Sequence, residues 1–184
     1  MKKNKLYIFT WVSGSWKTSV TNLLPKAKWS TPINFTTRQP RNDGELDEYV
    51  FVTDEVFKQL DEQGRLAESI TYWTNSYWIS KYWYEGLTYA IMEPNGRSIL
   101  KEQAELWNLC DKHWKEIDVE VVTIYITIDQ LTQHTRLTNR WDSVEEITKR
   151  AKDFETFAPT DSCVVLDWTI ESSLLVKQIE EWVE

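Results

Sequence analysis

The sequence predicts an α/β fold with a central parallel sheet, and three features of the chain lead to that prediction. Segments typical of strands and of helices alternate near both ends of the chain. Residues 119–128 alternate in polarity and are rich in β-branched side chains, which is typical of a strand. Between the two alternating parts lies a strand-rich insert, so a small lobe is expected to project from the main sheet.

The first expected element is a buried strand over residues 5–11, where apolar residues dominate. A helix is expected over residues 17–26, ending near Pro25 because proline interrupts the helical hydrogen bonds. Residues 34–53 are rich in Thr, Arg, Tyr, Phe and Val and contain the turn signal Asn42-Asp43-Gly44. This combination predicts a hairpin.

The next expected helix has Asp54 as its N-cap and runs to Gly64, with Val56, Phe57 and Leu60 at helical spacing. The remaining expected elements are strands over residues 66–80, 87–92, 119–128 and 163–166, and helices over residues 98–111, 129–157 and 172–183.

Composition excludes several classes of protein. The formal net charge of −8 is unlike that of a general nucleic-acid binder, which carries a basic face. There is no long apolar run, so no membrane-spanning helix is expected, and the short apolar stretch after the basic residues 1–5 is read as a strand instead of a signal peptide. Cys110 and Cys163 lie far apart and are expected to be free thiols in a reducing cytoplasm.

Residues 11–18 read W-V-S-G-S-W-K-T between the first strand and the first helix. They match the phosphate-loop pattern G-x-x-x-x-G-K-[ST], except that tryptophan occupies both glycine positions. In such a loop the backbone N–H groups surround the phosphates, the lysine bridges phosphate oxygens and the hydroxyl residue binds Mg²⁺. Lys17 and Thr18 are expected in these two roles. The predicted ATP-binding loop comprises Trp11, Val12, Ser13, Gly14, Ser15, Trp16, Lys17 and Thr18.

A second motif is Thr36-Thr37-Arg38-Gln39-Pro40-Arg41, followed by Gly44-Glu45 and an aromatic segment that starts at Tyr49. This series resembles the guanylate kinase family, which carries T-T-R-x-P-R, then G-E, then a strand with a tyrosine. The resemblance implies that Arg38 and Arg41 clamp the phosphate of GMP, as paired guanidinium groups do well. The hydroxyl of Tyr49 is expected to add a further donor.

The resemblance continues with Glu68 and with the segment Asn75-Ser76-Tyr77-Trp78-Ile79. Glu68 is expected to accept hydrogen bonds from N1 and the exocyclic amine of guanine, a pairing that adenine cannot make. Tyr77 is expected to be a second tyrosine ligand of the phosphate, and Asn34 belongs to the same predicted GMP-binding set. Ile79 departs from the pattern, because the family has Thr or Ser there in contact with the base.

Two further segments complete the resemblance. Residues 93–96 read E-P-N-G and resemble the family's D-x-x-G, so Glu93 is expected to face GMP and metal-bound waters. Residues 136–141 resemble the lid motif R-L-x-x-R-G. A lid would bring cations to the transferring phosphoryl group. The expected catalytic residues are Lys17, Arg136, Arg140 and Arg150.

The resemblance implies a P-loop NTPase-type three-layer fold with a strand-rich GMP-binding lobe and a helical lid. It implies the reaction ATP + GMP → ADP + GDP, with ATP and Mg²⁺ as cofactors and GMP or dGMP as substrate. A single domain is expected, with a core of residues 1–33, 90–128 and 156–184, a GMP-binding lobe of residues 34–89 and a lid of residues 129–155.

The chain contains 11 Trp and only 5 Gly, whereas average usage predicts roughly 13 glycines. Several tryptophans coincide with glycines of the family pattern (Trp11, Trp16, Trp78 and Trp141) or stand one residue away (Trp73). Trp114 stands where a helix is expected to end, a position that favours glycine. Some bacterial lineages read the codon UGA as glycine, which gives the hypothesis that these tryptophans are UGA codons printed as Trp. No such pattern singles out Trp29, Trp83, Trp107, Trp168 or Trp182.

Two alternatives stay open at this point. If the tryptophans of the phosphate loop are real, the loop is blocked and the chain is a non-catalytic guanylate kinase-like binding module. As printed, a chain with tryptophan where φ must be positive is expected to be inactive or to fold poorly. The other alternative is a related kinase that acts on ribose 1,5-bisphosphate, which Ile79 and Glu93 keep open.

Overall fold

The structure is a computed structural model, and it describes residues 4–11, 20–40, 45–46, 48–72, 75–92, 94–139, 143–151, 163–167 and 172–183. The chain divides into two compact units. The first comprises Met1–Tyr7, Trp29–Ala90 and Asn95–Val121, and the second comprises Ile8–Lys28, Ile91–Pro94 and Val122–Glu184. The described helices include none that is long and apolar enough to cross a membrane.

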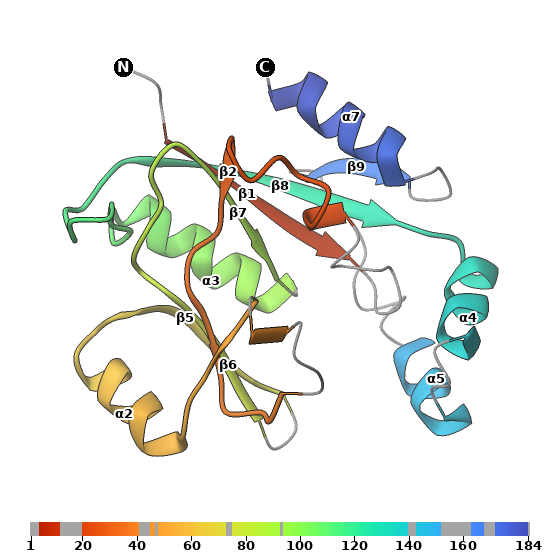
Figure 1. The fold of residues 1–184 in the computed structure, drawn as a ribbon, viewed down its shortest axis with the longest axis horizontal. Coiled ribbons are helices and arrows are strands. Elements are labelled where there is room, and N and C mark those ends of the chain that lie inside the picture. The colour runs from red at the N-terminus through yellow and green to blue at the C-terminus, as the bar shows by residue number, and fades with distance from the viewer. Residues whose placement is uncertain are drawn as a thin grey trace. The chain divides into compact units, whose positions relative to one another are not determined.

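The fold is α/β, as expected, with a central parallel sheet of five strands (Figure 1). The order of its strands is β2-β7-β1-β8-β9. Five consecutive side chains of the middle strand, residues 6–10, are at most 1% exposed, as expected for a strand covered on both faces. The strands are β1 (Asn4–Trp11), β2 (Trp29–Ser30), β7 (Leu87–Ile91), β8 (Val119–Thr127) and β9 (Cys163–Asp167).

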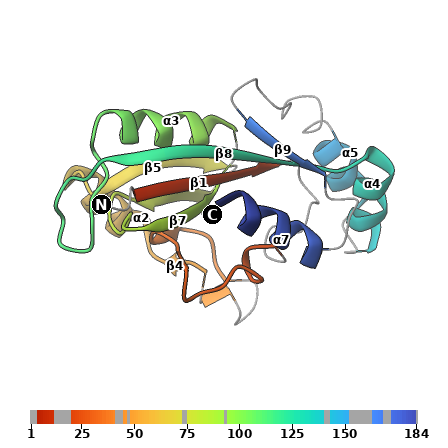
Figure 2. The same cartoon turned by 90° about the horizontal axis from the view of Figure 1, so that it is seen from above.

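Three described helices follow strands of this sheet, and a fourth, α5, comes after α4. Helix α3 begins at Pro94, a residue suited to the first helical turn because its missing N–H has no partner there anyway. Helices α4 and α5 lie side by side in both views (Figures 1 and 2). The buried side chains of α7 are Leu175, Val176 and Ile179, which recur at helical spacing. The bounds are α3 Pro94–Glu105, α4 Gln130–Asn139, α5 Val144–Ala151 and α7 Ser172–Val183.

A separate four-stranded sheet lies in the first unit, with strand order β4-β3-β6-β5. Its strands are β3 (Asn34–Thr36), β4 (Val50–Phe51), β5 (Leu66–Tyr72) and β6 (Asn75–Ser80), and helix α2 (Asp54–Glu62) lies beside it in Figure 1. Trp78 packs against Phe35 and Phe57, with ring centroids 5.9 and 4.3 Å away. One face of the small sheet is therefore closed by aromatic packing.

The hairpin expected over residues 34–53 is wrong, because β3 and β4 are parallel, with Phe35 opposite Val50. The true antiparallel partner of β3 is β6, which pairs Asn34 with Ile79. The turn signal at residues 42–44 lies outside the described residues. Asp54 is not an N-cap either: Thr53 caps α2, and its hydroxyl accepts a hydrogen bond from Val56 N at 3.4 Å.

Three expected helices have different bounds in the structure. The helix expected over residues 98–111 begins at Pro94 and ends at Glu105. Its early end has a local cause, since Trp107 has a φ of 59° and cannot continue the helix. The helix expected over residues 129–157 is two helices, α4 and α5. The described part of the helix expected over residues 17–26 is helical only at Val20 and Thr21 before turns begin.

Other expectations agree with the structure. Helix α7 has the expected bounds, and residues 66–80 contain two antiparallel strands. Cys110 is a free, buried thiol. Trp114, expected at a position suited to glycine, has a φ of 62° in the left-handed region.

Candidate functional site

The pairing register of the small sheet places the predicted site residues on one face. Asn34, Ile79 and Glu68 are register partners across β3, β6 and β5. Thr36 and Tyr77 form the adjacent row on the same face, because side chains two residues apart on a strand project to the same side. The two rows are about 7 Å apart along the strands. The tryptophan at position 78 belongs to the opposite face, so its ring does not enter this site.

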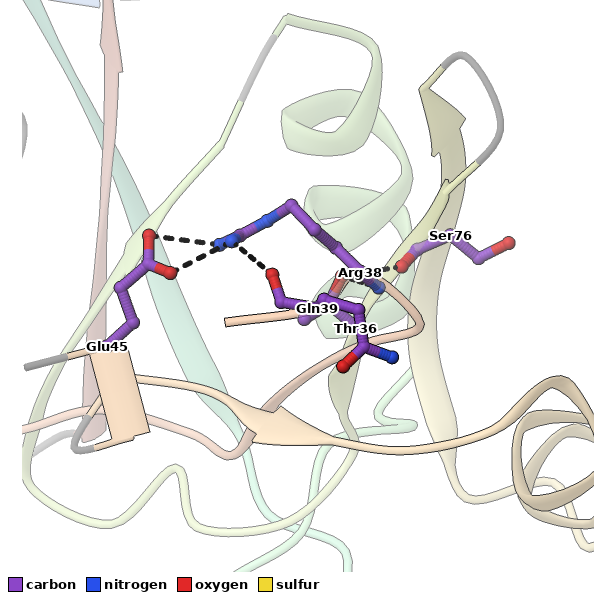
Figure 3. A network of polar contacts seen from close by, with 5 residues as sticks. All are labelled: Thr36, Arg38, Gln39, Glu45 and Ser76. Carbon is purple, nitrogen blue, oxygen red and sulfur yellow. Dashed lines mark hydrogen bonds and ion pairs between the residues drawn. The ribbon is translucent and has the colours of Figure 1, made fainter. Parts of the chain in front are cut away.

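Arg38 follows strand β3 and forms a bidentate ion pair with Glu45 (Figure 3). Its Nη1 lies 2.8 Å from one carboxylate oxygen and its Nη2 lies 3.1 Å from the other. Nη1 also donates to the carbonyl of Gln39 at 2.9 Å. The side chains of Arg38 and Glu45 are only 11% and 15% exposed. Such a shielded, bidentate pair fixes the direction in which the guanidinium points.

The backbone that carries Arg38 is tied to strand β6 by hydroxyl groups. The hydroxyl of Thr36 donates to the carbonyl of Ser76 at 3.0 Å and accepts from the backbone N–H of Arg38 at 3.2 Å. The hydroxyl of Thr37 accepts from the N–H of Ser76 at 2.9 Å. The two threonines of the motif therefore support the position of the arginine, and Figure 3 shows the link through Thr36 and Ser76.

Aromatic side chains surround the guanidinium of Arg38. Its central carbon lies 5.8 Å from the ring centroid of Tyr49 and 5.7 Å from that of Phe51, within the range of cation–π attraction. The rings of Tyr49 and Tyr77 meet edge to face at 6.4 Å. Arg38, Tyr49 and Tyr77, which the sequence predicted as phosphate ligands, thus lie together in one cluster, called the arginine cluster below.

Electrostatics set the charge states of the arginine cluster. Burial opposes the charge of Arg38, but the hydrogen bonds and the charge of Glu45 outweigh it, so the pKa of Arg38 is raised. Burial is also the main cause that raises the pKa of Tyr49, with the charge of Glu48 next. Arg38 is therefore cationic and the Tyr49 hydroxyl is a hydrogen-bond donor over the physiological pH range.

Among the described residues, Nε of Arg38 is buried and has no hydrogen-bond partner. A buried donor of this kind normally has an acceptor, and leaving it without one costs about 1–3 kcal/mol. An anion that docks on the cluster could supply such an acceptor.

Glu68 provides the opposite charge in the neighbouring row. Its side chain is buried, with 5% of the residue exposed, and its register partner Ile79 is 2% exposed. The hydroxyl of the fully buried Tyr84 donates to the carbonyl of Ser80 at 2.9 Å. Burial, followed by the charge of Glu68, raises the pKa of Tyr84 well above its ordinary value, so Tyr84 stays protonated. A buried acid beside an apolar surface can accept hydrogen bonds from a flat, polar ring.

Three further predicted residues belong to elements of the described chain other than the small sheet. Arg136 lies on α4, where burial lowers its pKa and the charge of Asp129 opposes that effect. Arg150 lies on α5, and Trp11 ends β1. The predicted residues outside the described part of the chain are Val12, Ser13, Gly14, Ser15, Trp16, Lys17, Thr18, Arg41, Glu93 and Arg140.

Two residues of the site were not predicted to have a role. Glu45 stood in the G-E motif, and its charge opposite to Arg38 seven residues earlier was the available signal. Tyr84 gave no signal, because it lies beyond the motif and approaches Glu68 only in the folded chain.

Comparisons with known proteins bear on the fold. No protein-family model and no curated protein matches the chain by sequence. A guanylate kinase from Anaplasma phagocytophilum has a similar structure, with a TM-score of 0.65 at 15% identity over 100% of this chain and 86% of that chain. A gluconokinase from Sinorhizobium meliloti 1021 gives a TM-score of 0.50 at 15% identity over 97% and 90% of the two chains. The chain therefore has a fold like that of these two kinases.

Proposed function

We propose that the chain is a guanylate kinase that transfers a phosphoryl group from ATP to GMP or dGMP. The observation that carries the proposal is the face of the small sheet described above. Tyr77 lies one register row from the buried carboxylate of Glu68, and it contacts Tyr49 in the cluster that holds the fixed cation of Arg38. A mononucleotide has groups that match this arrangement: its dianionic phosphate would bind near the cation, and its base would bind near the carboxylate.

The arginine cluster is proposed to bind the phosphate of GMP. Arg38 supplies the charge, its buried Nε supplies a donor that has no acceptor among the described residues, and the hydroxyls of Tyr49 and Tyr77 supply further donors. Hydrogen bonds between charged partners are about twice as strong as neutral ones. Arg41 is proposed as a second guanidinium ligand, on the strength of the T-T-R-x-P-R pattern.

Glu68 is proposed to select guanine, with Asn34 in the same row as a neighbouring polar group. A buried carboxylate would accept from both N1–H and the exocyclic amine of guanine. Adenine has no N1–H, so its binding would leave buried polar groups unpaired, and that is the strongest form of discrimination available to a site.

The phosphoryl donor is proposed to bind at the phosphate loop of residues 11–18, with Lys17 on the phosphates and Thr18 as the metal ligand. Mg²⁺ that arrives with ATP would neutralise charge on the transferring group. Glu93 is proposed to face the acceptor, and Arg136, Arg140 and Arg150 are proposed to stabilise the charge that spreads over the phosphoryl oxygens.

Ile79 favours a second candidate function. It places a buried aliphatic side chain between Asn34 and Glu68, where a hydroxyl would assist base binding. A kinase for ribose 1,5-bisphosphate needs the phosphate site but has no base to read. The buried charge of Glu68 weighs against this candidate, since a sugar phosphate gives that carboxylate no flat pair of donors.

A coupled assay of ADP formation from ATP and Mg²⁺ tests the proposal. The enzyme is the variant Trp11→Gly/Trp16→Gly beside the printed chain, and the acceptors are GMP, dGMP, AMP and ribose 1,5-bisphosphate. Turnover on GMP and dGMP is expected, with little on AMP. Preference for ribose 1,5-bisphosphate would select the second candidate. Absence of turnover on every acceptor would reject the kinase, and peptide binding by the same protein would then favour an interaction module.

A further inference from the structure

Five described residues have φ in the left-handed region, and their identities form a pattern. Two are glycines, Gly64 at 63° and Gly86 at 71°. The other three are all tryptophans, namely Trp83 at 82°, Trp107 at 59° and Trp114 at 62°. Only glycine adopts such angles freely, and a bulky side chain at a positive φ is a conformational outlier. Asparagine and aspartate are the residues other than glycine that most often adopt such angles. None of those in the described ranges does so, whereas three tryptophans do.

The ends of helices α2 and α3 allow a direct comparison. After α2, Gly64 N–H donates to Asp61 O at 2.8 Å and Arg65 N–H donates to Leu60 O at 3.0 Å. After α3, the bonds from Trp107 to Ala104 O and from Asn108 to Gln103 O have the same spacing, at 3.0 and 2.9 Å. Both are Schellman motifs, in which the C′ residue is left-handed and is usually glycine. Trp107 therefore occupies the position that Gly64 occupies at the end of α2.

Trp114 occupies a turn with an equally specific requirement. Its N–H donates to Asp111 O at 3.2 Å, and Asp111 N–H donates to Lys115 O at 2.9 Å. This is a three-residue hairpin loop, closed by the antiparallel bridge between Cys110 and Glu116. In such loops a type I turn is followed by a left-handed residue, and aspartate first with glycine fourth is the favoured sequence.

The side chains of the three tryptophans do not fill the core. Trp83, Trp107 and Trp114 are 45%, 55% and 46% exposed. Trp29 provides the contrast, because it is 5% exposed and packs edge to face against Tyr7 with ring centroids 5.1 Å apart. Removal of these half-exposed rings would cost the surface contacts of Trp83 and Trp114 with Tyr82 but no core packing, whereas the backbone at these positions favours a residue without a Cβ.

We infer that the protein made in its native host carries glycine at positions 83, 107 and 114. The codon at each of these positions is then UGA, read as glycine by the host. The inference goes beyond the proposed function and does not depend on it. It includes two positions, 83 and 107, that no sequence motif marks. It does not extend to Trp29 and Trp78, which lie in strands where φ gives no preference for glycine.

The gene gives the first test. The expected result is UGA at codons 83, 107 and 114, with glycine in the corresponding peptides when protein from the native host is examined by mass spectrometry. UGG at these codons, or tryptophan in those peptides, would overturn the inference.

A thermal unfolding series gives a second test that does not need the native host. The triple variant Trp83→Gly/Trp107→Gly/Trp114→Gly is compared with the matching triple alanine variant, which removes the same rings but retains Cβ. The glycine variant is expected to have the higher Tm, by at least about 5 °C. Trp29→Gly is the control and is expected to lower Tm, because a buried ring is lost. Equal Tm values for the two triple variants would contradict the inference.

Discussion

At the scale of single residues, Arg38 shows that some residues of a motif hold another residue of the same motif in position. The guanidinium is held by Glu45, and its backbone is held by the hydroxyl of Thr36, which bonds in turn to Ser76. In the motif T-T-R, the two threonines thus support the arginine, which is the proposed phosphate ligand. The sequence predicted the arginine as a ligand and offered Glu45 as a nearby opposite charge, but the bonds of the two threonines to Ser76 depend on the fold.

Glu68 yields the sharpest residue-scale prediction. Glu68→Gln replaces a carboxylate that can accept two hydrogen bonds with an amide that has a single acceptor oxygen. Loss of one bond to a charged acceptor, worth about 1.5–3 kcal/mol, is expected to weaken GMP binding by roughly 10–100-fold. IMP, which lacks the exocyclic amine, is expected to lose less, so the preference for GMP over IMP shrinks. Titration calorimetry with both nucleotides measures the two losses.

Glu62→Gln, on the exposed end of α2, is the matched control and is expected to change neither affinity. Equal weakening of GMP and IMP by Glu68→Gln would mean that Glu68 supports the sheet without reading the base.

At the scale of elements, local sequence patterns predicted some helix bounds and strand pairings correctly and others wrongly. Helix α7 was predicted to the residue, because apolar side chains recur at helical spacing throughout it. The parallel pairing of β3 with β4 was missed, since a turn signal between two β-rich segments favours a hairpin and the actual partner, β6, is distant in the chain. The end of α3 was missed because tryptophan at position 107 gives no stop signal, whereas glycine would.

Asp129 at the start of α4 gives a pH-dependent prediction. Its Oδ1 accepts from the N–H of Thr132 at 2.7 Å and its Oδ2 from the hydroxyl at 2.5 Å, as an N-cap does. The hydroxyl bond first and then the backbone bond lower the pKa of Asp129. A lowered pKa adds stability above the unfolded value of about 3.9, and that stability is lost as pH falls through the folded value.

Asp129→Ala is therefore expected to lower Tm at pH 7 and to have a smaller effect near pH 3, in thermal unfolding at both pH values. Asp129→Asn keeps an acceptor oxygen without a titrating group, so its difference in Tm from the alanine variant is expected to change little with pH. The same loss for Asp129→Ala at both pH values would contradict the role of the charge.

At the scale of the whole molecule, the tryptophans affect both stability and function. A non-glycine residue in the left-handed region costs roughly 1–2 kcal/mol, so three such positions cost roughly 3–6 kcal/mol against a net stability of about 5–15 kcal/mol. The printed chain is therefore expected to be only marginally stable. Glycine at positions 11 and 16 would also complete the pattern G-x-x-x-x-G-K-[ST] ahead of Lys17 and Thr18.

The overall architecture was predictable from the sequence, and the assembly of the site was predictable only in part. Alternating strands and helices gave the parallel sheet, and ordered motifs gave Arg38, Tyr49, Glu68 and Tyr77 as members of one site. The row that joins Asn34, Ile79 and Glu68 depends on strand register, which is set by long-range pairing and which no local pattern encodes.

Equilibrium binding of GMP and AMP without ATP is the most direct test of guanine selection by the small-sheet site, because it leaves residues 11–18 out of the measurement. We expect that GMP binds and that AMP binds at least about 100-fold more weakly, since adenine has no N1–H for Glu68 to accept and a hydrogen bond to a charged group is worth about 1.5–3 kcal/mol. Equal affinity for the two nucleotides, or no binding of GMP by the folded chain, would contradict it.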